Sequence, residues 1–112
     1  MELSPSLTAA LATVGRHGPL TPSEVAARER IQRPTATRVL AKLQDLELIQ
    51  RTPDPQDRRS SLLAVTPAGA GLLDELRTRK TAFLAERLER LDPDERATLD
   101  RAADILERML AE

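Results

Sequence analysis

The sequence predicts a mainly helical α+β fold in which one small β-hairpin interrupts a series of helices. Apolar residues recur at three- and four-residue steps along most of the 112-residue chain, a spacing typical of amphipathic helices. Where such a stripe begins, a capping residue followed by proline often marks the helix start. Residues 48–65 differ, because two short apolar runs flank a polar segment with two prolines, which favours a hairpin.

The first two helices are predicted from such starts. Ser4-Pro5 begins a helix that ends by Gly18. Thr21-Pro22-Ser23-Glu24 predicts a capping box, in which the threonine and the glutamate each bond the other's backbone N–H, and a short helix follows. After a brief turn, a longer helix begins near Pro34. A short helix, a turn and a longer helix form the helix-turn-helix pattern.

The helix over residues 32–46 has two faces. One face carries an apolar stripe expected to pack on a small core: Ala36, Val39, Leu40, Leu43 and Leu46. The other presents hydroxyls and guanidiniums, which can bond base edges and phosphates in the major groove of DNA. The candidate DNA contacts of this helix are Arg33, Thr35, Ala36, Thr37, Arg38 and Lys42. The alternative is an ordinary amphipathic surface helix with solvated arginines.

Two strands are predicted after this helix, over residues 48–52 and residues 60–65. Between them, residues 53–59 hold two prolines and five polar or charged residues, so we expect an irregular, exposed tip. A strand, a basic tip and a returning strand directly after a helix-turn-helix form a wing. The candidate DNA contacts of the wing are Arg51, Asp57, Arg58 and Arg59.

Two further helices are predicted toward the carboxyl end. Thr66-Pro67 begins a long one that runs to about Arg90, and Asp92-Pro93 begins the last. The last helix carries an apolar stripe that a single chain has little left to cover: Leu99, Ala102, Ala103, Leu106, Met109 and Leu110. We therefore expect a homodimer, with a winged helix-turn-helix DNA-binding region over residues 1–66 and a helical dimerisation region over residues 67–112. The alternative is a monomer whose last helix folds back on its own long helix.

The composition argues against several classes of function. The chain has no cysteine and one histidine, which excludes disulfides and thiolate catalysis within it and argues against a metal site. No nucleophile–base pair and no phosphate-binding glycine loop is present, so we expect neither an enzyme nor a cofactor. No apolar run approaches the length of a membrane span and no signal peptide opens the chain, so a cytoplasmic protein without membrane contact is expected.

The net charge of −1 hides an asymmetry. Residues 28–59 hold eight Arg and Lys against five Asp and Glu, whereas residues 72–112 hold eight against eleven. Positive charge gathered in the middle third is consistent with a short nucleic-acid footprint, although chance clustering is the alternative. Phe83 is the only aromatic residue, and binders of single strands rely on aromatic stacking. Double-stranded DNA is therefore the expected nucleic acid.

Four segments, in this order, resemble the MarR family of bacterial transcriptional regulators: residues 18–26, residues 33–38, residues 54–59 and residues 65–69. The resemblance implies a winged-helix homodimer that binds pseudo-palindromic operators, usually as a repressor. Many members of that family release DNA when a small aromatic compound binds. Family members usually begin with one more helix, and this chain starts at the match to the second. A ligand pocket would lie near Leu7, Leu11, Leu72 and Leu76, and the alternative is that these leucines are plain core.

The resemblance also implies roles for single residues. The helix with Thr35, Thr37 and Arg38 matches the recognition helix. Asp57-Arg58-Arg59 matches the D-x-R motif of the wing, in which Arg59 would enter the minor groove and Asp57 would hold it; a turn-capping aspartate is the alternative. The family commonly has glycine at the position of Glu47. Since a left-handed glutamate costs roughly 1–2 kcal/mol, we expect the helix to continue through it into Leu48.

A second function class is a winged-helix protein-interaction module that does not bind DNA. Such a module favours exposed apolar residues on the outward face of the second helix of the motif. The polar and basic residues found there favour DNA instead.

Overall fold

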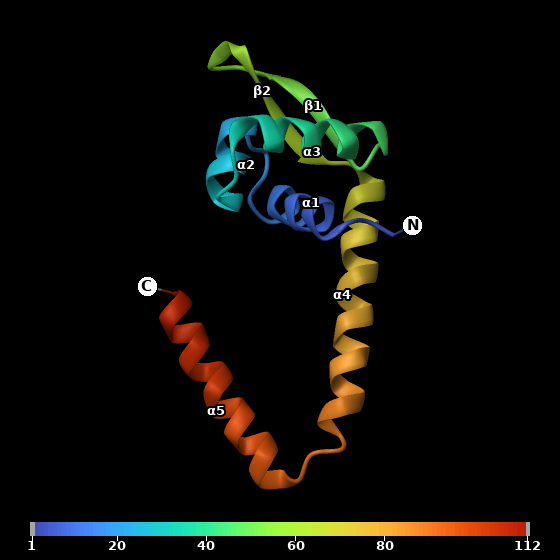
Figure 1. Cartoon of the computed structure of the whole chain (residues 1–112), viewed down its shortest axis with the longest axis vertical. Helices are drawn as coiled ribbons and strands as arrows, with labels where there is room; N and C mark the ends of the chain where they lie inside the picture. The colour runs from blue at the N-terminus through green and yellow to red at the C-terminus, as the bar shows by residue number, and fades with distance from the viewer. Residues whose placement is uncertain (1, 112) are drawn as a thin grey trace. The chain divides into compact units, whose positions relative to one another are not determined.

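The computed structural model describes residues 2–111. In this part of the chain, helices α1 (Pro5–His17), α2 (Pro22–Glu29) and α3 (Arg33–Asp45) precede strands β1 (Ile49–Asp54) and β2 (Asp57–Val65). Helices α4 (Pro67–Leu88) and α5 (Pro93–Leu110) follow (Figure 1). The prediction of a mainly helical fold with one antiparallel hairpin is confirmed. No helix described here is long and apolar enough to cross a membrane.

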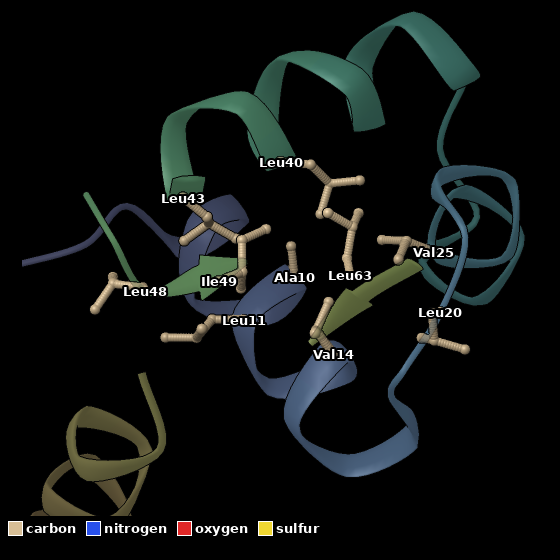
Figure 2. Packing of buried hydrophobic residues seen from close by; sticks show 10 residues of the cluster. All are labelled: Ala10, Leu11, Val14, Leu20, Val25, Leu40, Leu43, Leu48, Ile49 and Leu63. Carbon is tan, nitrogen blue, oxygen red and sulfur yellow. The ribbon is translucent and has the colours of Figure 1, made fainter. Parts of the chain in front are cut away.

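The chain divides into two compact units, one up to Leu76 and one from Arg77 onward, so the division falls within α4. In the first unit, α1, α2 and α3 pack with the hairpin around one core (Figure 2). Its buried residues come from all of these segments: Ala10, Leu11, Val14, Leu20, Val25, Leu40, Leu43, Leu48, Ile49 and Leu63. The apolar stripe of α3 faces this core as predicted, with Ala36, Leu40 and Leu43 buried.

The hairpin is fixed to the core through its second strand. Leu63 of β2 exchanges two backbone hydrogen bonds with Leu20, of 3.0 Å and 2.7 Å, in the segment between α1 and α2. On its other side β2 pairs with β1, from Ile49 opposite Val65 to Pro53 opposite Ser61. Since Leu63 is wholly buried, the base of the hairpin is part of the core, and the exposed tip projects from it.

The helix starts form as the capping residues predict. Thr21 Oγ1 accepts from the Glu24 N–H at 3.1 Å, and the Glu24 carboxylate accepts from the Thr21 N–H at 3.0 Å. Asp92 and Glu95 make the same reciprocal pair at the start of α5. These bonds satisfy backbone N–H groups that an α-helix leaves without partners at its first turn.

The expected continuation of α3 through Glu47 is wrong. Glu47 has φ = 60°, in the left-handed region. Its N–H donates to the Gln44 carbonyl at 2.9 Å and the Leu48 N–H donates to the Leu43 carbonyl at 3.0 Å, the pattern of a Schellman cap. The reversal brings Leu48 and Ile49 into the core. Burying one such side chain contributes about 1.5–3 kcal/mol, which exceeds the roughly 1–2 kcal/mol of the left-handed glutamate.

The expected irregular tip over residues 53–59 is also wrong. β1 runs to Asp54 and β2 begins at Asp57, so only Pro55 and Gln56 form the turn. A proline is tolerated in β1 because that strand pairs on one side only, and a residue on an open edge need not donate to a neighbour. The pairing then shifts register, since Asp54 pairs with Asp57 directly after Pro53 pairs with Ser61.

The second unit holds the end of α4 and all of α5. None of the α5 residues described is buried, and large apolar side chains on both segments are exposed. Their exposed fractions range from 47% to 83%: Phe83, Leu84, Leu99, Ile105, Leu106, Met109 and Leu110. The single chain therefore leaves the apolar stripe of α5 uncovered.

Candidate nucleic-acid interface

The candidate interface begins on the face of α3 that points away from the core. Arg33, Thr37, Arg38 and Lys42 are exposed, and Thr35 is half-buried. Ala36 is wholly buried, so its place among the candidate DNA contacts is corrected: it belongs to the apolar stripe of the same helix. A helix buried on one side and polar on the other is the form that enters the major groove.

Hydrogen bonds hold several of these side chains in place. Arg33 donates from Nη1 to the Ser23 hydroxyl at 2.5 Å, which ties the first turn of α3 to the first turn of α2. Arg38 donates from Nη2 to Thr35 Oγ1 at 3.4 Å, and the Thr37 hydroxyl donates to the Arg33 carbonyl at 3.0 Å. The contribution of Ser23 was missed from the sequence, because a contact across ten residues leaves no local pattern.

The wing presents a second basic group. Arg51, Arg58 and Arg59 are exposed, and the register shift leaves residues 58–60 without partners in β1. The Asp57 carboxylate accepts from the Arg59 backbone N–H at 2.9 Å. This bond caps the turn, and it also holds the backbone from which Arg59 extends. Such an interruption of a ladder re-aims side chains at a strand end.

The basic side chains of both elements keep their charge available. Within residues 2–111, no carboxylate forms an ion pair with Arg38, Lys42, Arg58 or Arg59. In Figure 1, α3 and the hairpin run along the same side of the first unit. A paired arginine would have to exchange a carboxylate for a phosphate, whereas these arginines meet a phosphate or a base edge without that loss.

Of the four leucines expected near a ligand pocket, Leu7, Leu11 and Leu72 lie in or against the core cluster. Leu11 is wholly buried, Leu7 and Leu72 pack against the core cluster, and Leu76 is half-buried at the end of the first unit. This packing favours the alternative of plain core leucines.

Comparisons with known proteins identify a family for this chain. Residues 3–61 match the family model described as MarR family. An uncharacterized HTH-type transcriptional regulator of Mycobacterium leprae is 38% identical over 110 residues, which cover 98% of this chain and 77% of that protein. The HTH-type transcriptional repressor MdtR of Bacillus subtilis is 30% identical over 93 residues, covering 83% of this chain and 60% of the repressor.

Solved structures share the fold. A Mycobacterium tuberculosis crystal structure, that of RV1404, superposes with a TM-score of 0.87 at 26% identity, covering 96% of this chain and 73% of that one. Streptococcus pneumoniae FabT, solved in complex with DNA, superposes with a TM-score of 0.79 at 22% identity, covering 98% of this chain and 77% of FabT. The latter likeness establishes the architecture.

Proposed function

This chain belongs to the MarR family of transcriptional regulators, and from that premise we propose that it represses transcription as a homodimer bound to a pseudo-palindromic site in duplex DNA. The observation that carries the proposal is the pair of basic groups, one on α3 and one on the wing, that no carboxylate neutralises in the part of the chain described. The DNA bound to FabT and the naming of MdtR as a repressor support it.

In the proposed complex, α3 lies in the major groove and the wing reaches the adjacent minor groove. Arg38 then contacts a base edge, and Arg59 enters the negative potential of a narrow A·T-rich groove. Residues 1–66 form the DNA-binding region and residues 67–112 the dimerisation region. The two halves of the site would be one helical turn apart, about 34–36 Å between recognition helices.

The alternative of a protein-interaction module has less support. Within the described residues, the large apolar side chains that are exposed lie at Phe83 and beyond, and α3 carries none of them. An interaction surface built on α3 would have to rely on the same charged and hydroxyl groups that suit DNA.

Affinity measurements on sites selected from random duplex DNA test the proposal. Arg38→Ala is expected to weaken binding by about 1–3 kcal/mol and to relax specificity at one position, whereas Arg59→Ala weakens binding mostly at sites with A·T-rich flanks. Binding of the unmodified protein should fall steeply with salt, because arginines displace condensed counterions. Arg16→Ala, which removes one exposed positive charge at the end of α1, is the matched control. Flat salt dependence, or no enriched site, would contradict the proposal.

Release of DNA by a small aromatic compound is a separate part of the proposal, and it comes from the family alone. The pocket would have to open among Leu7, Leu11, Leu72 and Leu76, of which the first three lie in or against the core cluster. Calorimetric titration with a panel of aromatic acids, followed by a DNA-release assay, tests it. Absence of both heat and release would assign these leucines to the core only.

A further inference from the structure

The hydroxyls of Thr35 and Thr37 on α3 have opposite roles in their hydrogen bonds: Thr37 donates and Thr35 accepts. Thr37 Oγ1 lies 3.0 Å from the Arg33 carbonyl oxygen, and since a carbonyl oxygen can only accept, the Thr37 hydroxyl donates. Thr35 Oγ1 lies 3.4 Å from Nη2 of Arg38, and since a guanidinium can only donate, the Thr35 hydroxyl accepts. The direction of each bond therefore follows from the partner.

The groups that remain for a ligand differ accordingly. A hydroxyl has one proton, and Thr37 uses it within the helix, so this exposed side chain offers only lone pairs outward. Thr35 keeps its proton and can still donate it. Donation from Thr37 to a ligand would require breaking its bond to the Arg33 carbonyl.

The major groove distinguishes these two polarities. Adenine N6 and cytosine N4 are amino groups that donate, whereas guanine O6, thymine O4 and the purine N7 atoms accept. A lone pair of Thr37 bonds the amino groups and is repelled by the acceptors. Arg38, which only donates, has the opposite requirement.

We infer that Thr37 reads the exocyclic amino group of an adenine or a cytosine through a lone pair of its hydroxyl. The inference rests on the proposed function, because it needs α3 in the major groove. It names a specificity-determining residue and the chemical group that it recognises, from hydrogen bonds that exist before DNA arrives.

The experiment combines protein variants with modified bases. A site selected by the unmodified protein is resynthesised with single amino groups deleted, by purine in place of adenine or by pyrimidin-2-one in place of cytosine. Each duplex is titrated with the unmodified protein and with Thr37→Val, Thr37→Ser and Thr35→Val. Valine has the shape of threonine without the hydroxyl, and serine keeps the hydroxyl without the methyl group.

At one position in each half-site, amino deletion is expected to weaken binding of the unmodified protein and of Thr37→Ser about fivefold, the worth of one ordinary hydrogen bond. Thr37→Val should bind the intact site about fivefold more weakly and lose nothing further on deletion. Thr35→Val should still respond to deletion at that position. Thermal melting of each variant checks that these exposed or half-buried substitutions leave the fold intact.

Two results overturn the inference while leaving the proposed function standing. In the first, the binding loss of Thr37→Val is coupled to deletion of a base acceptor. This is tested with 2-aminopurine, which lacks the O6 acceptor, in place of guanine. The other is the absence of coupling to any amino deletion in the selected site. Failure of the unmodified protein to select a site would instead contradict the proposed function, and the inference with it.

Discussion

Gly69 is the residue at which a single added methyl group has the clearest consequence. A Cβ there would lie 2.1 Å from the Leu48 carbonyl oxygen, which also accepts from the Thr66 N–H at 3.0 Å. Gly69→Ala is expected to lower the free energy of unfolding by about 1–3 kcal/mol, because backbone must move on one side of the contact. Urea denaturation measures the change.

Gly71 provides the matched control for Gly69, since it lies in the same helix and no atom lies within 4 Å of its added Cβ. Gly71→Ala is expected to stabilise the protein by roughly 0.5–1 kcal/mol, because alanine favours the helix and restricts the unfolded chain. Equal effects of the two alanines would show that the contact with Leu48 does not constrain α4.

Glu47 carries left-handed backbone strain that glycine would remove. Its φ of 60° costs a glutamate roughly 1–2 kcal/mol, and the extra freedom of an unfolded glycine returns about 0.5–1 kcal/mol of that. Glu47→Gly is therefore expected to raise the melting temperature modestly. Asp45→Gly, two residues earlier and still helical, should lower it. A melting temperature that falls in both variants would contradict the left-handed assignment.

Among the elements, the start of α2 has a measurable pH signature. The pKa of Glu24 is lowered below its ordinary value, chiefly by the hydrogen bond from the Thr21 backbone N–H. The Thr21 hydroxyl lowers it less, and Arg28 less still. Because the folded pKa is the lower one, the stabilisation is present above the unfolded pKa and is lost as pH falls through the folded pKa. The melting-temperature difference between the unmodified protein and Glu24→Gln should therefore shrink from neutral pH to about pH 3. A difference that stays constant over this range would contradict the assignment.

The wing offers a test of how Asp57 acts. Its carboxylate bonds the Arg59 backbone N–H, so Asp57→Ala should weaken DNA binding by freeing the segment that carries Arg59. Adding Arg59→Ala to Asp57→Ala should cost less than Arg59→Ala alone, since the two act on one contact. Asp54→Ala, which removes the analogous bond to the Gln56 N–H, is the control, and filter binding at low salt is the measurement. If the losses of binding free energy are additive, Asp57 and Arg59 act independently of each other.

The elements also show what the sequence could and could not predict. Helix starts at Thr21 and Asp92 were predictable because their bonds span three residues, and the stripe of α3 because its spacing is local. The left-handed Glu47 was not, since its strain is offset by burial of Leu48 in a core formed by distant segments. Likewise the anchoring of Arg33 by Ser23 depends on how two helices meet.

At the scale of the whole molecule, the uncovered stripe of α5 predicts association. Leu106 is 54% exposed and Met109 is 63% exposed in the single chain. We expect light scattering at micromolar concentration to report a dimer, and removal of residues 92–112 to yield a monomer, because two copies can bury these faces against each other.

A single substitution separates this face from the rest of α5. Leu106→Glu should weaken the dimer. Ala97→Glu, on the opposite face of the same helix, should not. Full-length protein that remains monomeric both free and on DNA would exclude the dimer and the palindromic site together.

The proline in β1 has a consequence for solubility. β2 is bridged on its outer side by Leu20 at Leu63, whereas β1 pairs with β2 alone, so β1 presents an open edge along its length. Unprotected edges can template strand addition by another molecule and so lead to aggregation. Pro53 has no N–H to offer such a strand, and Arg51 adds a charge two residues earlier. Pro53 thus disfavours aggregation of the hairpin through this edge.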